Sequence, residues 1–453
     1  MSQTTHSPHR APTAAATTVP DTHGPRPRGA SLRSPRRWLL ASALTLVAPA
    51  TAWADAVTDW NAQANQVIAT AGGAPQQFRI FAMVHIAVHD ALNAIDRRYR
   101  PYTVISPGNP NASPDAAVAR AARDVLVATL PTRADVVNAA YTAYIAALPA
   151  CPAALPGCVS AGEAVGANAA AAILALRQAD GSATPHVPYT LAPAAGVYQP
   201  TLPLPAAPAP YPQYGGWGSV TPFGLVSSMQ FRAGGSPFLN LRGKAYARDY
   251  NEVKQVGSFA VRNAAPDSEE SRIARFWPGG GQNLNGFTRV ILAGRSSDPW
   301  DNARLYAVMN MAVSDALVVT FRGKYHYNFW RPYTAIRWAN DGNPGTAPDP
   351  EWTSYITTPP YPDYTCGLPS TIGAATEVLR DTFRTDEVPF TYTATGLPPA
   401  VSRSYTRLSQ AADESASARV YGGIHFRTGC TAAVELGEKV GRYMFRTQLR
   451  KLH

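Results

Sequence analysis

The chain has 453 residues, of which 45% are hydrophobic and 15% charged, and its formal net charge is +10. This hydrophobic content can form a buried core, which excludes a wholly disordered chain. Residues 1–37 carry six arginines and one acid. Residues 55–453 therefore hold 34 basic and 29 acidic residues, without a basic stripe, and this excludes an obvious nucleic-acid-binding surface.

An export signal is predicted over residues 1–54. The apolar run 38–50 follows Arg36-Arg37, which resembles a twin-arginine signal, and ends in a small-residue cleavage pattern at Ala54. An uncleaved anchor is the alternative, but the run is short for a bilayer that needs about 20 residues. We therefore expect a periplasmic or extracellular protein. We see no other segment long and apolar enough to span a membrane, so we expect no stable membrane insertion after cleavage.

Beyond residue 54, apolar residues recur at spacings of three and four, which predicts helices almost throughout and no convincing strands. Asp298-Pro299 is a helix start signal. The Pro-, Tyr- and Gly-rich stretch 185–240 is too long for a simple connection, so we expect an extended excursion that wraps the surface or lines a site. The predicted helices cover 76–96, 114–130, 133–149, 160–178, 299–320, 369–383, 402–420 and 431–449.

An internal repeat relates the two halves of the chain. Residues 87–92 match 312–317, and residues 99–103 match 330–334, with six extra residues between the blocks of the second copy. Chance similarity of alanine-rich helices could explain the first match, but it explains the second less well. We therefore predict an all-α fold of two related helical bundles. The expected parts are a signal peptide (1–54), a first bundle (55–184), the excursion (185–240) and a second bundle carrying the site (241–453).

The repeat also makes Asp90 and Asp315 equivalent positions. We interpret both as polar contacts within helix packing rather than as catalytic acids.

The first candidate motif is Lys324-Tyr-His-Tyr-Asn-Phe-Trp-Arg331-Pro332. Seven residues make about two helical turns, so the two cations would share a face if this stretch is helical, and Pro332 would end or restart the helix. A pair of solvated surface charges is the alternative. The aromatic neighbours favour a partly buried setting, in which an anion between the cations would pair their charge.

The second motif is a Pro- and Tyr-rich turn, residues 359–366, that leads into a helix. The backbone N–H groups of Gly367 and Leu368 would face whatever lies before that helix. Any junction between a loop and a helix offers such groups, so this motif gains weight only beside the cations.

The third motif joins Arg419 to His425. The two residues would diverge on a continuous helix, but Gly422-Gly423 lets the chain turn so that both can converge. A lone histidine after a helix is more often structural, and the company of three cations favours a site.

In this order the motifs resemble the vanadium-dependent haloperoxidase and type 2 phosphatidic acid phosphatase superfamily, in its bacterial haloperoxidase-like branch, over about residues 81–446. The resemblance implies a vanadate cofactor, a catalytic set of Lys324, Arg331, Arg419 and His425, and an oxyanion contact from Gly367. His425 would be the apical vanadium ligand. Hydrogen peroxide, halide and an organic acceptor would be the reactants of a haloperoxidase.

Two alternatives stay open. In an exported acid phosphatase, His425 would instead attack a phosphate ester and form a phosphohistidine. The other alternative is a phosphate- or vanadate-binding relative without turnover. The family usually reads Pro-Ser-Gly-His where this chain has Thr365-Cys366-Gly367-Leu368, and leucine cannot transfer a proton.

Two further residues bear on these departures from the family pattern. His326 or Asp363 would be the replacement acid, if one exists. In many relatives a carboxylate four residues after the apical histidine orients it, and here that position is Gly429, so support for His425 must come from elsewhere.

Four cysteines in an exported chain favour disulfides. Cys366 is next to Gly367 and Cys430 follows His425 by five residues. Since the resemblance implies that Gly367 and His425 approach the same ion, a crosslink between the two cysteines would tie the two site loops together. Cys151 and Cys158 would close a small surface loop. The alternative for Cys366 is a reactive nucleophile beside cations.

Overall fold

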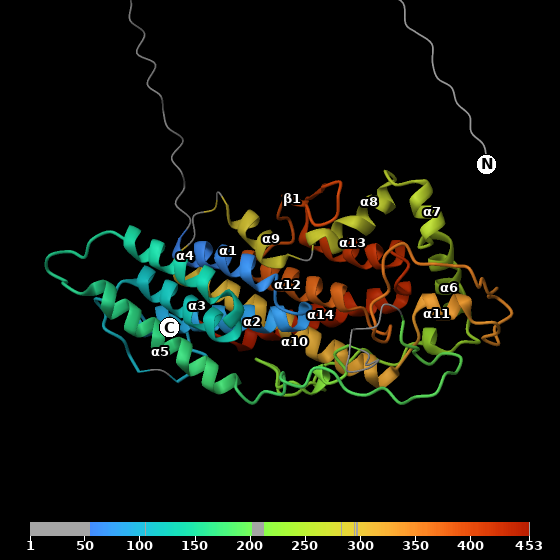
Figure 1. Cartoon of the computed structure of the whole chain (residues 1–453), viewed down its shortest axis with the longest axis horizontal. Helices are drawn as coiled ribbons and strands as arrows, with labels where there is room; N and C mark the ends of the chain where they lie inside the picture. Colours follow the sequence, from blue (N-terminus) through green and yellow to red (C-terminus); the bar gives the residue numbers. More distant parts are fainter. Residues whose placement is uncertain are drawn as a thin grey trace, which may run out of the picture. The chain divides into compact units, whose positions relative to one another are not determined.

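The computed structural model describes residues 55–453 except 105, 202–212, 282, 294, 296–297 and 453. The export signal expected over residues 1–54 lies outside the described residues. Helices dominate the described part, which contains a single two-stranded sheet (Figure 1). The expected all-α class is therefore confirmed.

The helices of the N-terminal half are α1 (Ala56–Ile68), α2 (Ala74–Ile95), α3 (Pro114–Thr129), α4 (Ala134–Ala147) and α5 (Cys158–Arg177). Those after the excursion are α6 (Lys244–Val256), α7 (Phe259–Ala264), α8 (Glu269–Phe276), α9 (Leu284–Leu292), α10 (Pro299–Tyr327), α11 (Pro332–Arg337), α12 (Gly367–Phe383), α13 (Leu408–Tyr421) and α14 (Arg427–Thr447).

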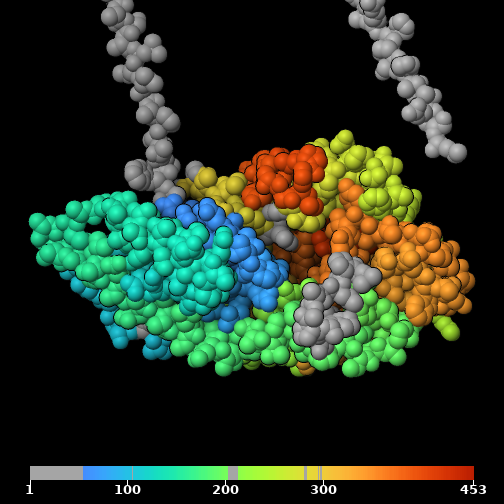
Figure 2. All heavy atoms as spheres, viewed as in Figure 1, coloured from blue at the N-terminus to red at the C-terminus, as the bar shows by residue number. Residues whose placement is uncertain are grey.

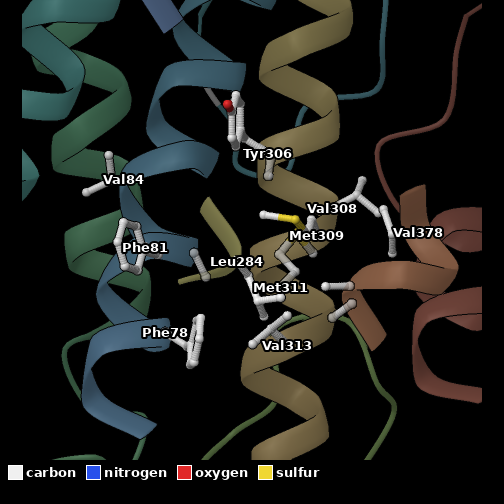
Figure 3. Close-up of a cluster of buried hydrophobic side chains, with 14 of the residues drawn as sticks. Phe78, Phe81, Val84, Leu284, Tyr306, Val308, Met309, Met311, Val313 and Val378 are labelled. Atoms are coloured by element: carbon white, nitrogen blue, oxygen red, sulfur yellow. The ribbon is translucent and has the colours of Figure 1, made fainter. Parts of the chain in front are cut away.

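Helix α10 is the central helix of the described part. The Asp298 side chain caps it by accepting from the backbone N–H of Trp300 at 2.8 Å, and Pro299 is its first residue. Most of its side chains are buried, because α2 packs against one side and α12 against another. Figure 3 shows Leu284 of α9 between α2 and α10, with Val378 of α12 on the other side of α10. The core is thus continuous between the two halves.

A β-hairpin occupies residues for which no strand was expected. Strands β1 (Phe390–Ala394) and β2 (Val401–Tyr405) pair antiparallel, with Phe390 opposite Tyr405. The expected helix at 402–420 is wrong in its first part, because α13 begins only at Leu408. Each strand alternates buried and outward-facing residues over five positions, a run too short to stand out from helical spacing.

The excursion runs along two segments of the candidate site. Tyr198 N–H donates to the Asn328 carbonyl at 2.9 Å, and Trp330 N–H donates to the Gly196 carbonyl at 3.1 Å. Gln213 N–H donates to the carbonyl of Pro360 at 2.8 Å. The described part of the excursion therefore lines the site. Lining a site was one of the two positions expected for it.

The repeat-related carboxylates have parallel roles. Asp90 on α2 accepts from the backbone N–H groups of Tyr102 and Thr103 at 2.8 and 2.7 Å. Asp315 on α10 accepts from three successive backbone N–H groups, residues 223–225, at 2.6 to 3.0 Å. Both side chains are buried and tie connecting segments to a helix. This structural role accounts for both carboxylates without catalysis.

Three helices among the described residues are long and apolar enough to cross a membrane by length and composition: α2, α5 and α10. The expectation that no such segment exists after residue 54 is wrong on this criterion. The most apolar windows of α2 and α10 are 83% and 94% buried inside the protein, so core packing explains their composition. The corresponding window of α5 is 33% buried.

Candidate oxyanion site

The motif with Lys324 and Arg331 is not one continuous helix. Helix α10 ends at Tyr327, and Asn328 then adopts the left-handed conformation with φ +48°. Helix α11 starts at Pro332, with Arg331 as its N-cap. Pro332 therefore restarts the helix, and the two cations meet because the chain turns between them rather than because they share a helical face.

Lys324 and Arg331 both reach the loop before α12. Lys324 Nζ donates to the carbonyls of Pro362 and Asp363 at 2.9 and 2.8 Å, and Arg331 Nε donates to the Tyr361 carbonyl at 2.7 Å. Both side chains are fully buried. Burial holds the pKa of Lys324 well below its usual range, and the neighbouring Arg331 lowers it further.

The turn after α13 brings His425 to Arg331. Gly423 has φ +75°, and a Cβ there would lie 2.1 Å from the Gly257 carbonyl oxygen, so only glycine fits. His425 Nε2 then lies 2.7 Å from Arg331 Nη1. Arg419 and His425 also line one cavity, so the turn brings these two residues together as expected.

The contacts of His425 define its tautomer. A guanidinium can only donate, so Nε2 must accept from Arg331, and the proton of a neutral imidazole resides on Nδ1. Burial keeps the pKa of His425 well below its usual range, and Arg331, Lys324 and Arg419 add to this effect. The ring is therefore neutral, with Nε2 directed toward the cations.

Asp363 supplies the carboxylate that the sequence lacks at position 429. Its Oδ1 lies 2.8 Å from His425 Nδ1, although the pair is not aligned as a hydrogen bond. A Cβ on Gly429 would lie 3.3 Å from Asp363 Oδ2, so the missing side chain leaves the room that the carboxylate occupies. Burial raises the pKa of Asp363 to about 7, against the influence of Arg331 and Lys324.

The structure separates the two candidates for a replacement acid. Asp363 is buried behind His425 and faces Nδ1, the ring nitrogen away from the cations, so it can orient the ring but does not reach the cavity. His326 lies at the surface, 3.4 Å from Arg232. Neither residue takes the place of a proton donor at Leu368. Glycine at 429, together with an acid in a proline-rich turn, was the signal that could have identified the role of Asp363.

Both expected disulfides are present, Cys366–Cys430 and Cys151–Cys158, and none of the described cysteines is free. The alternative of Cys366 as a nucleophile is therefore wrong. The first crosslink fixes the start of α12 to α14, and Cys366 N–H also donates to the Gly429 carbonyl at 3.2 Å.

The start of α12 presents free backbone donors. Cys366 is its N-cap and makes no side-chain cap hydrogen bond. In the first turn Gly367 and Leu368 have N–H groups without intrahelical partners, while Pro369 has none to offer. Both Gly367 and Leu368 line a cavity, so the N-terminal end of the helix dipole faces it.

That cavity has a volume of about 200 Å³ and reaches Gly367, Arg419 and His425. Figure 2 shows a hollow between the blue N-terminal helices and the orange segment, with orange-red residues at its floor. Among the described residues no carboxylate forms a salt bridge with Lys324, Arg331 or Arg419. Arg331 Nη2 and Arg419 Nε are buried and have no hydrogen-bond partner among the described residues.

Buried cations need compensation, because a charge transferred from water without a partner costs several kcal/mol, of order 3–5 when one partner of a buried pair is missing. Arg419, His425 and the N–H groups at the start of α12 line the cavity, and Arg331 contacts His425 from outside that lining. This combination of guanidinium nitrogens and helix N–H groups suits a tetrahedral oxyanion. The arrangement can hold such an anion beside a neutral imidazole.

Comparison with known proteins gives a consistent family. Residues 304–453 match the family model described as the VCPO second helical-bundle domain. A stretch of 90 residues is 31% identical to vanadium chloroperoxidase of Curvularia inaequalis, and it covers 18% of this chain and 14% of that protein.

Solved structures resemble nearly the whole described chain. A structure described as the first bacterial vanadium-dependent iodoperoxidase has a TM-score of 0.71 and 25% identity, covering 88% of this chain and 95% of the other. A holo-type bacterial vanadium-dependent chloroperoxidase has a TM-score of 0.66 and 20% identity, covering 85% and 95%, and it supports the fold alone.

Proposed function

We propose, from the premise that this chain belongs to a vanadium haloperoxidase-like family, that it binds vanadate and uses hydrogen peroxide to oxidise a halide for transfer to an organic acceptor. The observation that carries the proposal is that Arg419 and His425 line one cavity, while the buried cations Arg331 and Lys324 lie beside His425 and no described carboxylate forms a salt bridge with any of the three cations.

The residues present fit vanadate. Arg331 Nη2 and Arg419 Nε are buried donors with no partner in the described part of the chain, and the N–H groups at the start of α12 face the cavity that Arg419 lines. Lys324 would add a third charge. Bound vanadate would supply the activation of peroxide toward halide, and the protein would supply a preorganised cationic environment for it.

His425 is prepared for the apical role that the resemblance implies. The neutral ring has a lone pair on Nε2. Asp363 lies beside Nδ1 and favours the tautomer that carries the proton on Nδ1. The hydrogen bond from Arg331 to Nε2 must break for this lone pair to reach an anion. Anion binding offers Arg331 a charged acceptor in exchange.

Leu368 limits the chemistry. It lines the cavity where an acid or base would be useful, and it cannot move a proton. Any rate enhancement would therefore come mainly from the cationic site. A protein that binds phosphate or vanadate without turnover is one of the alternatives. A phosphohistidine phosphatase would use the same Nε2 lone pair.

One experiment distinguishes these functions. The purified protein is assayed with vanadate, hydrogen peroxide, bromide and a halogen acceptor, and separately with an aryl phosphate. Bromination that disappears when vanadate is removed supports the proposal. Hydrolysis of the aryl phosphate, inhibited by vanadate, would indicate a phosphatase, and binding of vanadate without either activity would indicate a binding protein.

We further propose that the mature protein is periplasmic or extracellular. Support comes from the signal expected at residues 1–54 and from the two disulfides, which persist in oxidising compartments. N-terminal sequencing of the exported protein should begin at Asp55. A cytosolic protein that retains residues 1–54 would contradict this.

A further inference from the structure

We propose that the cavity over the cationic site binds one small uncharged aromatic molecule of the size of phenol, so that the acceptor sits in the protein. The reactive part of this inference rests on the proposed function, whereas the binding part can be measured alone.

The size of the cavity suits a single ring. Its volume is about 200 Å³. An apolar protein cavity of about 150 Å³ is enough to bind benzene. The same cavity is lined by Arg419 and His425, so a ring bound in it would lie next to the oxyanion position.

Aromatic side chains form one wall of the cavity. Phe321 packs edge to face against Tyr361, with ring centroids 5.2 Å apart, and against Tyr214 at 5.3 Å. Phe78 adds a fourth ring to the lining. Ring faces and edges of opposite partial charge favour an aromatic guest over a saturated one.

Leucines complete the apolar surface. Leu317 of α10 and Leu368 of α12 both line the cavity. At position 368 a polar side chain would be adjacent to the guest, and leucine instead offers apolar contact. Leu368 cannot transfer a proton, and its role in this proposal is to bind the substrate.

A hydroxyl group on the guest has a polar partner available. Gln213 lines the cavity, and its side-chain amide makes no hydrogen bond to any described residue. Tyr361 also lines the cavity, and its hydroxyl likewise makes no hydrogen bond to a described residue. The lining therefore matches a phenol better than benzene itself.

The chemistry of such a bound acceptor balances with the proposed function. Hydrogen peroxide, halide and one proton give hypohalous acid and water. The hypohalous acid then replaces a hydrogen on a ring carbon with halogen and releases a second water. Halogenation within the cavity would favour one ring position over the others, because the guest is held in one orientation.

Ala74 is the position for a blocking substitution. It lies at the start of α2 and lines both this cavity and an adjoining cavity of about 190 Å³, which also shares Phe78. Ala74→Leu should reduce the volume of the cavity proposed for phenol while remaining compatible with a helix start. Ala134→Leu is the matched control, because Ala134 is the first residue of α4 and lines neither cavity.

The test is an NMR titration of phenol into the full-length protein without vanadate, with cyclohexanol as a saturated guest of similar size. We expect Ala74→Leu to weaken phenol binding at least about tenfold and Ala134→Leu to change it less than about twofold. Cyclohexanol should bind more weakly than phenol. Equal binding of the two guests, or an unchanged phenol affinity in Ala74→Leu, would overturn the proposal.

A second measurement needs no substitution. Bound phenol should give nuclear Overhauser contacts to the methyl groups of Leu317 and Leu368 in the unaltered protein, and their absence would also overturn the proposal. Orthovanadate is titrated into the same samples. Phenol binding without vanadate binding would remove the proposed function and leave this site standing, and the reverse result would do the opposite.

Discussion

Asp363 Oδ1 lies 2.8 Å from His425 Nδ1, and the carboxylate extends over the backbone of Gly429. The residue that orients the histidine therefore comes from the loop before α12, whereas the sequence position four residues after His425 has no side chain. The loop that contacts Lys324 and Arg331 thus also positions the imidazole. One segment sets the geometry of all three groups.

The protonation of Asp363 should control anion affinity. Its pKa is about 7 in the free protein, and a bound anion raises it further, so binding above this pH requires proton uptake. We expect sulfate affinity to be flat just below about pH 7 and to fall above it, by at most about tenfold per pH unit. Sulfate is the probe because its own charge does not change in this range.

Asp363→Asn should remove the decline that begins near pH 7. Lys324, whose pKa is also lowered by burial, contributes a decline that the variant keeps. Nitrogen NMR of His425 provides a second readout, because loss of the carboxylate should reduce the population with the proton on Nδ1. An identical pH profile in both proteins would contradict this role for Asp363.

Arg419→Ala and Lys324→Ala should each weaken orthovanadate binding severely, by about 1.5–3 kcal/mol or more, because each removes a charge-assisted contact from a desolvated site. Isothermal titration measures the affinities. Arg322→Ala is the matched control, because Arg322 lies on α10, the helix of Lys324, but is exposed and does not line the cavity. If both site variants bind as tightly as the control, the site assignment is wrong.

The two disulfides should differ in their effect on stability. By loop entropy, the crosslink between Cys366 and Cys430, 64 residues apart, contributes about 4 kcal/mol, and that between Cys151 and Cys158, 7 residues apart, about 2 kcal/mol. Denaturant unfolding of the paired Cys→Ser variants should reproduce this order. Peptide mapping without reductant should recover both crosslinked pairs, and free thiols at 366 and 430 would refute the pairing.

Leu368→His should raise turnover. It places a proton-transfer group in the cavity, a role that typically contributes a factor of about 10² to 10⁴. Bromination rates at saturating vanadate measure the effect. If turnover falls while folding and vanadate affinity persist, leucine is adapted to an apolar substrate, and phenol affinity should then fall in the same variant.

The cations of the site could be predicted because their signals are local. Aromatic residues flank Lys324 and Arg331 in the sequence, and the glycines between Arg419 and His425 indicate a turn. The shared helical face of the two cations was conditional on a continuous helix, and only the restart at Pro332 is confirmed. Helix α10 continues to Tyr327, beyond the expected end at residue 320, and Asn328 in a left-handed conformation then ends it. Asparagine followed by Pro332 is a signal for such an ending.

Features that depend on contacts between distant segments left only indirect signals in the sequence. Asp363 can lie beside His425 because Gly429, 66 positions later in the sequence, has no side chain to occupy that space. The β-hairpin likewise depends on pairing between two five-residue strands, each too short to show a period of its own.

An anion that binds to His425 Nε2 must replace the hydrogen bond that Arg331 donates to this nitrogen. The measured dissociation constant therefore reflects the difference in free energy between His425 bound to the anion and His425 bound to Arg331. A charge-assisted hydrogen bond contributes about 1.5–3 kcal/mol. The measured constant therefore understates the attraction of the unhindered site by about one to two powers of ten.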